Sequence, residues 1–135
     1  MTDARPVRDF MTACPHVLEP TQSVAAAGEL MRAQRIRHVP VVASGRLCGL
    51  VSERDVTLVL SLVDVDPKKV RVRDVMATET YTVNPTTPLR DVASEMATSK
   101  AGSAVVVTEG GEVVGIFTTI DALRALEEML EGAVR

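Results

Sequence analysis

One short stretch of this chain occurs twice. Residues 7–11 read Val-Arg-Asp-Phe-Met, and residues 72–76 read Val-Arg-Asp-Val-Met, 65 positions later. The match continues, because Pro20 corresponds to Pro85 at the same offset, and after one inserted residue in a Gly-containing turn the offset becomes 66. Self-similarity of this kind indicates two copies of one supersecondary unit. Each copy is too small to bury a sheet well alone, so the two are expected to pack against each other.

Both copies predict the same order of elements. A short strand ends in a Pro-containing turn, a helix follows, two β-rich runs form a hairpin, and a second helix closes the unit. Ser23 is the expected N-cap of the first helix in copy one, and Thr87, followed by Pro88, is the expected N-cap in copy two. The strands and closing helices are predicted at 17–18, 39–42, 47–51 and about 53–62, and at 81–83, 104–107, 113–117 and about 119–131.

The predicted fold class is therefore α+β, with two β-α-β-β-α repeats packed about a pseudo-twofold axis. Clefts along the junction of the repeats are the natural ligand sites. We place the first repeat at 1–63, a linker at 64–71 and the second repeat with its C-terminal helix at 72–135, because the stretch 64–69 is polar and contains Pro.

Composition excludes several classes of partner. The formal net charge is -3, and no run of five or six like charges occurs, so a nucleic-acid partner is not expected. The first ten residues lack the apolar core of a signal peptide, and no apolar stretch approaches the length of a membrane span, so no membrane partner is expected. We expect a soluble cytoplasmic protein whose two cysteines stay thiols.

Common catalytic motifs are missing from the sequence. It contains no phosphate-loop, dinucleotide-binding, HExxH or GxSxG pattern, so we do not expect an enzyme. A soft metal could be chelated by Cys14 and His16, joined in space by His38 and Cys48. Buried thiols and a loop histidine explain these residues better, so we predict no metal site and no required cofactor.

The strongest motifs stand at the end of each hairpin. Residues 49–55 read Gly-Leu-Val-Ser-Glu-Arg-Asp and residues 115–121 read Gly-Ile-Phe-Thr-Thr-Ile-Asp. With the repeated Val-Arg-Asp-x-Met, the Thr-Val-Asn-Pro at 82–85 and the stretch 37–42, this pattern resembles the CBS domain family, in which tandem repeats form one module (a Bateman module). The resemblance covers nearly the whole chain and implies a regulatory sensor that binds adenosine-containing ligands.

Two hydroxyl and carboxylate pairs, Ser52 with Asp55 and Thr118 with Asp121, are the main site candidates. A hydroxyl at a strand-to-helix junction, beside free backbone N–H groups, suits phosphate. A carboxylate one turn away can accept two hydrogen bonds from a ribose diol. The same spacing describes a helix capping box, a purely structural role. Its occurrence at equivalent positions of both copies favours nucleotide binding, with the hydroxyls capping the helices as well.

The resemblance further implies that the Asp of one copy shares its ligand with the early strand of the other. The site of Ser52 and Asp55 would include Arg37, His38, Tyr81, Thr82 and Ala101, and that of Thr118 and Asp121 would include His16, Val17, Ile36, Arg37, Gly102 and Ser103. Gly102 and Ser103 cannot match the charge-assisted phosphate contacts of Arg37 and His38, so the first site should favour more phosphate charge. Arg37 and His38 equally fit solvated charges on an edge strand.

The expected ligand is AMP, ADP, ATP or S-adenosylmethionine, since all four present adenosine. Tyr81 either stacks on the base or is a half-buried strand tyrosine, and the structural interpretation is favoured.

Two helical faces suggest self-association. The stretch 56–63 is apolar nearly all round, and Leu123, Leu126 and Leu130 form a stripe. Since CBS modules dimerise through such helices, we expect a homodimer, with burial inside the monomer as the alternative. The competing function is a structural protein-protein interaction module with vestigial ligand sites, and in either case an unidentified effector protein is a further partner.

Overall fold

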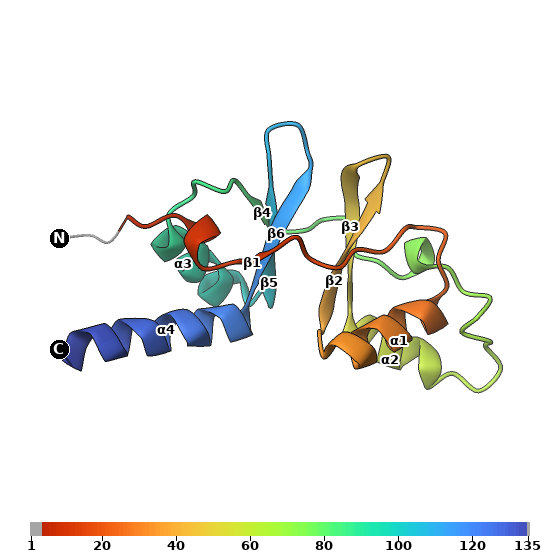
Figure 1. The fold of residues 1–135 in the computed structure, drawn as a ribbon. Coiled ribbons are helices and arrows are strands. Elements are labelled where there is room, and N and C mark those ends of the chain that lie inside the picture. Colours follow the sequence, from red (N-terminus) through yellow and green to blue (C-terminus); the bar gives the residue numbers. More distant parts are fainter. Residues whose placement is uncertain (1–3, 135) are drawn as a thin grey trace. The chain divides into compact units, whose positions relative to one another are not determined.

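The computed structural model describes residues 4–134, so the predicted boundaries at Met1 and Arg135 lie outside the described residues. The chain divides into two compact units (Figure 1). The terminal unit joins the residues up to Pro15 to those from Tyr81 onward, and the central unit is His16–Thr80. The N-terminal residues of the first sequence copy thus pack with the second copy. The division predicted at residues 63 and 72 follows the sequence repeat rather than the packing, and it stays a prediction.

The central unit is a β-hairpin with two helices beside it. Its elements are α1 (Val24–Gln34), β2 (His38–Ala43), β3 (Arg46–Ser52), α2 (Glu53–Leu60) and the 3-10 turn η2 (Val72–Asp74). The strands β2 and β3 are antiparallel, and Leu18 forms a parallel bridge with Val41 where a short strand was predicted. The core consists of Leu18, Val24, Ala27, Met31, Val39, Val41, Val51, Val56, Val59 and Val72.

The terminal unit repeats this order and completes it with an N-terminal strand. Its elements are η1 (Val7–Asp9), β1 (Thr12–Ala13), β4 (Thr82–Val83), α3 (Leu89–Ser99), β5 (Ser103–Val107), β6 (Val113–Thr118) and α4 (Thr119–Val134). The sheet order is β1-β6-β5-β4, with β4 parallel to β5 and the other pairs antiparallel. The predicted α+β class with two β-α-β-β-α repeats is confirmed.

Helix starts follow the sequence in one copy and depart from it in the other. The Ser23 Oγ accepts a hydrogen bond from the Ala26 N–H at 3.1 Å, which confirms it as the N-cap of α1. The predicted capping role of Thr87 is wrong, because α3 has Pro88 at its N-cap and no side-chain cap. The Thr87 hydroxyl instead accepts from the Asn84 N–H at 3.1 Å, so this hydroxyl stabilises the turn that precedes the helix and does not cap α3. The predicted ends differ slightly too, since α2 stops at residue 60 and α4 continues to residue 134.

The repeated Met packs against the repeated Gly of each hairpin. A Cβ built on Gly49 would lie 2.6 Å from the Met76 Sδ and 2.8 Å from the Ala77 carbonyl oxygen. A Cβ on Gly115 would collide with the Met11 side chain. At Gly49 the close backbone oxygen leaves no room for a side chain, whereas at Gly115 the nearest atoms belong to the Met11 side chain.

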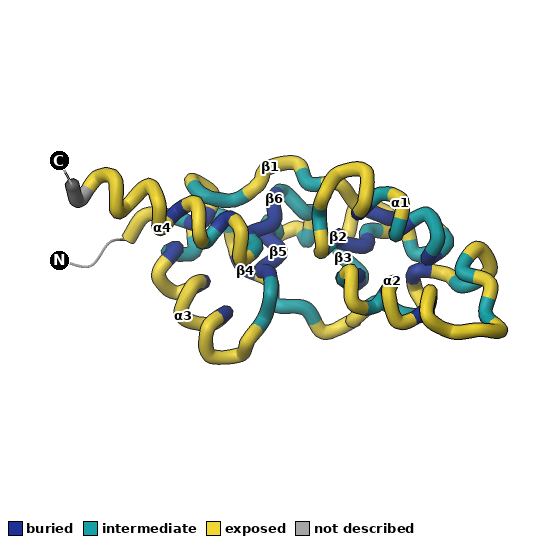
Figure 2. The backbone as a smooth tube through the Cα atoms, turned by 90° about the horizontal axis from the view of Figure 1, so that it is seen from below, coloured by how far each residue is buried: buried dark blue, intermediate teal, exposed yellow. Residues whose placement is uncertain are grey.

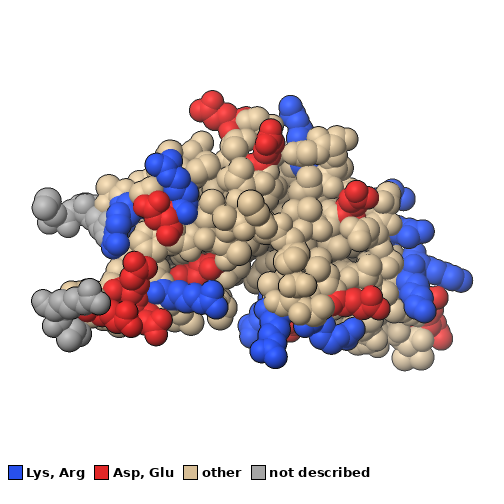
Figure 3. All heavy atoms as spheres, viewed as in Figure 1, with Lys and Arg blue, Asp and Glu red and all other residues tan. Residues whose placement is uncertain are grey.

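Burial follows the elements, and charged side chains of both signs are mixed on the surface. Figure 2 shows that buried positions follow the strands and single faces of the helices. In Figure 3, basic and acidic side chains are interspersed over the visible face. Among the described residues, no helix combines the length and apolar character needed to cross a membrane.

Candidate functional site

The pair Ser52 and Asp55 lies at the junction of β3 and α2. The Asp55 Oδ2 accepts from both the Ser52 N–H and the Ser52 hydroxyl at 2.9 Å, and the Asp55 N–H donates to the Ser52 Oγ at 3.2 Å. These contacts form a complete capping box, so Ser52 and Asp55 have the structural role that their spacing indicated. The other oxygen, Oδ1, receives no donor from the described residues, and it remains open to a ligand hydroxyl.

The equivalent pair in the terminal unit has the same local geometry and one additional contact. The Asp121 Oδ2 accepts from the Thr118 N–H at 2.9 Å and from the Thr118 hydroxyl at 3.2 Å. Its Oδ1 also accepts from the Thr12 hydroxyl at 3.0 Å. The Asp121 side chain is 6% exposed, whereas Asp55 is only partly buried. Thr12 was not identified from the sequence. The available signal was a difference between the copies, because Thr12 follows Met11 whereas Ala77 follows Met76.

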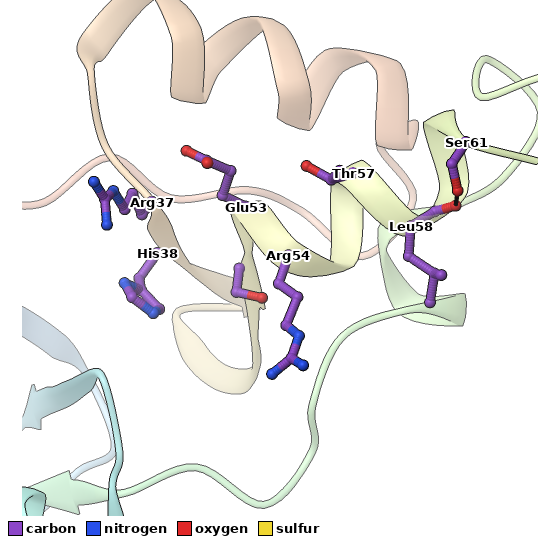
Figure 4. Close-up of a pocket in the computed structure, with 8 residues that line it drawn as sticks. Arg37, His38, Glu53, Arg54, Thr57, Leu58 and Ser61 are labelled. Atoms are coloured by element: carbon purple, nitrogen blue, oxygen red, sulfur yellow. Dashed lines mark hydrogen bonds between the residues drawn. The ribbon is translucent and has the colours of Figure 1, made fainter.

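A pocket of about 520 Å³ opens on the central unit around the start of α2. This volume is within the range of small-molecule sites. Figure 4 shows His38 and Arg54 extending to one side of the β3–α2 junction, while Glu53 extends to the other. The lining residues are Arg37, His38, Ser52, Glu53, Arg54, Thr57, Leu58 and Ser61.

A backbone hydrogen bond holds Arg37 beside the start of α2. The Glu53 N–H donates to the Arg37 carbonyl at 2.7 Å, which holds the residue before β2 against the first turn of α2. Arg54 was not predicted as a site residue, because a charged residue on the first turn of an exposed helix has no distinguishing sequence signal. Two guanidinium groups and an imidazole thus border one pocket, an arrangement suited to phosphate.

His38 differs from a solvated edge-strand histidine. Burial lowers its pKa from the ordinary value of 6.5, and the neighbouring Arg37 lowers it further, while the carboxylates of Asp55 and Glu53 act in the opposite direction. At neutral pH the imidazole is therefore neutral. A phosphate group placed beside it would favour the protonated form and raise the pKa. Arg37 is exposed, so its description as a solvated charge agrees with the structure as well.

The remaining predicted site residues divide between the units. Tyr81, Thr82, Ala101, Gly102 and Ser103 belong to the terminal unit with Thr118 and Asp121, and His16, Val17 and Ile36 belong to the central unit with Ser52 and Asp55. The predicted sharing of a ligand between copies therefore stays a prediction. Within its own unit, Ser103 is buried at the start of β5, and Gly102 accepts from the Thr119 N–H at 3.3 Å, the counterpart of the contact between Glu53 and Arg37.

Tyr81 is half-buried against the core of the terminal unit. Desolvation raises the pKa of its phenol, and the carboxylates of Glu95 and Asp91 raise it further. The favoured structural role of Tyr81 fits this environment.

The thiols and imidazoles do not form a metal centre in the part of the chain that the structure describes. No three His, Cys, Asp or Glu side chains lie there in an arrangement that could hold a metal ion. Cys14 is exposed, and Cys48 is half-buried with its Sγ donating to the Val41 carbonyl at 3.3 Å.

Comparison with known proteins gives a consistent match. The family model of the CBS domain matches residues 7–62 and 72–128. A solved protein of Vibrio cholerae assigned to acetoin utilization (AcuB) is 34% identical, with a TM-score of 0.85 and 93% of each chain covered. CBSX2 of Arabidopsis thaliana, solved in complex with AMP, is 28% identical, with a TM-score of 0.78 over 93% of this chain and 98% of that one. An A-adding tRNA nucleotidyltransferase of Aquifex aeolicus is 32% identical over 93% of this chain, which spans only 15% of that enzyme.

Proposed function

Because this chain belongs to the CBS domain family, we propose that it is a regulatory module that binds an adenine nucleotide and contacts the phosphates at its central unit. The observation that carries this proposal is the pocket in which Arg37, His38 and Arg54 border the start of α2 beside Ser52. The AMP complex of CBSX2 supports an adenosine ligand. CBS pairs are regulatory modules, and we expect no catalytic activity from this one.

Two chemical contacts define the proposed mode of binding. The carboxylates of Asp55 and Asp121 accept the ribose hydroxyls, and the backbone N–H groups at the helix N-termini beside Ser52 and Thr118 receive phosphate. Ligand binding regulates the protein only if the ligand has different affinity for two arrangements of the module. ADP and ATP, with more phosphate charge than AMP, should gain most from the arginines of the central unit.

Thermal unfolding with AMP, ADP, ATP, S-adenosylmethionine and adenosine in turn tests the proposal. A ligand at a hundredfold excess over its dissociation constant stabilises a site by about 2.7 kcal/mol, which raises Tm by several degrees. The shift should vanish in the Asp55→Asn and Asp121→Asn double variant. Asparagine keeps one oxygen to accept the backbone N–H in each capping box, so the helices retain their caps while the ribose contact is lost.

The matched control is Asp64→Asn, which changes an exposed carboxylate outside both pairs and should leave the shift unchanged. Absence of a shift with all five compounds at millimolar concentration contradicts the proposal. That result would favour the structural interaction module, whose partner binding does not depend on nucleotide.

A homodimer is the assembly that the exposed apolar side chains support. Leu58 on α2 is 65% exposed and Leu123 on α4 is 61% exposed, with Leu60, Leu126 and Leu130 also exposed. Exposed apolar stripes of this kind are typical of interaction surfaces. Light scattering should give twice the monomer mass for the wild type and the monomer mass for Leu123→Glu with Leu130→Glu. An unchanged dimer in that variant would exclude α4 as the interface.

A further inference from the structure

The carboxylates of Asp55 and Asp121, which we propose bind ribose, differ in how many of their acceptor positions are free. An ionised carboxylate offers about four lone-pair directions. In Asp55 two are occupied, both by Ser52. In Asp121 three are occupied, two by Thr118 and one by the Thr12 hydroxyl. A ribose diol has two donors, so Asp55 can accept both of them and Asp121 only one.

This difference originates at a single position of the repeat. Thr12 lies opposite Ile116 in the β1–β6 pairing, and Ala77 lies opposite Leu50 in the corresponding bridge of the central unit. Both residues follow the repeated Met, and both partners follow the repeated Gly. Alanine has no hydroxyl, so the central unit has no group at this position that could donate to its carboxylate.

We propose that Thr12 holds Asp121 closed to a ribose diol, so that adenosine ligands bind at Asp55 before they bind at Asp121. The inference rests on the proposed function and adds an order of binding to it. To place both ribose hydroxyls on Asp121, a ligand must displace the Thr12 hydroxyl from a carboxylate that is 6% exposed. A hydrogen bond to a charged group is worth enough to weaken ligand affinity about tenfold when it must be broken. Thr12 thus acts through Asp121 as a positioning residue.

Adenosine is the probe for the test, because it lacks the phosphates that the central pocket would contact. In full-length Asp55→Asn protein only the Asp121 site remains, and in Asp121→Asn protein only the Asp55 site remains. Calorimetric titration should give weaker binding in the first background than in the second. Thr12→Val, which keeps the β-branched shape and removes the donor, should strengthen binding at Asp121 about tenfold. Thr12→Ser, which keeps the hydroxyl, should bind like its parent.

The reciprocal change is made in the other unit. Ala77→Thr in the Asp121→Asn background should weaken adenosine binding at Asp55 about tenfold, and Ala77→Val, which adds bulk without a donor, should weaken it less. Because Thr12 and Ala77 are both exposed, these variants are expected to fold, and circular dichroism checks this.

The outcomes separate the two hypotheses. Weaker or unchanged binding in Thr12→Val overturns the inference, because Thr12 would then orient Asp121 for the ligand or have no effect. Equal changes in Thr12→Val and Thr12→Ser overturn it too. If the wild type binds none of adenosine, AMP, ADP, ATP and S-adenosylmethionine, the proposed function itself is overturned, and the inference with it. If it binds ATP but not adenosine, the proposed function stands and the same variants are titrated with ATP, with the same expected order.

Discussion

In the central unit, Arg37, His38 and Arg54 border the junction of β3 and α2, whereas the corresponding positions of the terminal unit hold Gly102, Ser103 and Ile120. Both junctions keep the same capping geometry. The backbone framework is thus duplicated while the charges are not. The comparison shows that a repeat can preserve the capping geometry of both junctions while only one copy carries basic side chains beside it.

The largest expected effect comes from removing the charges that distinguish the central unit. Arg37→Ala with Arg54→Ala should weaken ATP binding about a hundredfold, because each guanidinium contact with a phosphate contributes at least about 1.5 kcal/mol. Adenosine binding should change little. Calorimetric titration measures both affinities. Arg46→Ala, at the opposite end of β3, is the matched control and should bind ATP like the wild type. Equal losses for ATP and adenosine would argue against a phosphate role.

The second effect concerns the glycines that receive the repeated Met. Gly49→Ala should lower the free energy of unfolding by about 2 kcal/mol, because the new Cβ meets the backbone oxygen of Ala77 as well as Met76. Gly115→Ala should cost about 1 kcal/mol, because the three nearest atoms all belong to the flexible Met11 side chain. Urea unfolding provides the values.

A second substitution sharpens this contrast. Adding Met11→Ala to Gly115→Ala removes the colliding side chain, and adding Met76→Ala to Gly49→Ala leaves the collision with the backbone oxygen in place. In the terminal unit, the double variant should therefore lose less free energy of unfolding than the sum of the two single losses. In the central unit the two losses should be nearly additive. Equal compensation in both units would show that the backbone contact is unimportant.

The smallest effect is the pH dependence that His38 brings to the central unit, because the equivalent Ser103 does not titrate in this range. The folded protein lowers the pKa of His38, so the unfolded chain binds the proton more readily. Stability should therefore fall as the pH decreases through 6.5, the ordinary pKa of histidine. Urea unfolding between pH 7.5 and 5.5, a window of about one unit on either side of that pKa, gives the free energy of unfolding at each pH. That free energy should change less with pH in His38→Gln than in the wild type. An identical pH dependence in that variant would contradict the assigned environment.

Much of the fold could be predicted because the two copies constrain each other. Ser23 and the Gly-containing hairpins carry local signals that no other part of the chain overrides. The failure at Thr87 arose because two neighbouring turns compete for one hydroxyl, and sequence does not show which of them obtains it. Local patterns were therefore reliable where a group had only one possible partner.

The candidate site residues were named from the repeat and from the family resemblance, and residues that neither of them supports were missed. Ser52, Asp55, Thr118 and Asp121 stand at matching positions. Arg54 has no counterpart in the second copy, so comparing the copies gave it no support. The contact between Thr12 and Asp121 joins residues 109 positions apart, and only the register of β1 against β6 brings them together.

The terminal unit is discontinuous in sequence, since the whole central unit separates its first strand from the rest. During synthesis on a ribosome, the central unit is complete once Thr80 has emerged, and domains generally fold as units in the order of their appearance. The β1–β6 pairing has to wait for the C-terminal half of the chain and closes a much longer loop. A nascent chain therefore passes through a stage in which the pocket at the start of α2 can exist before Thr12 has met Asp121.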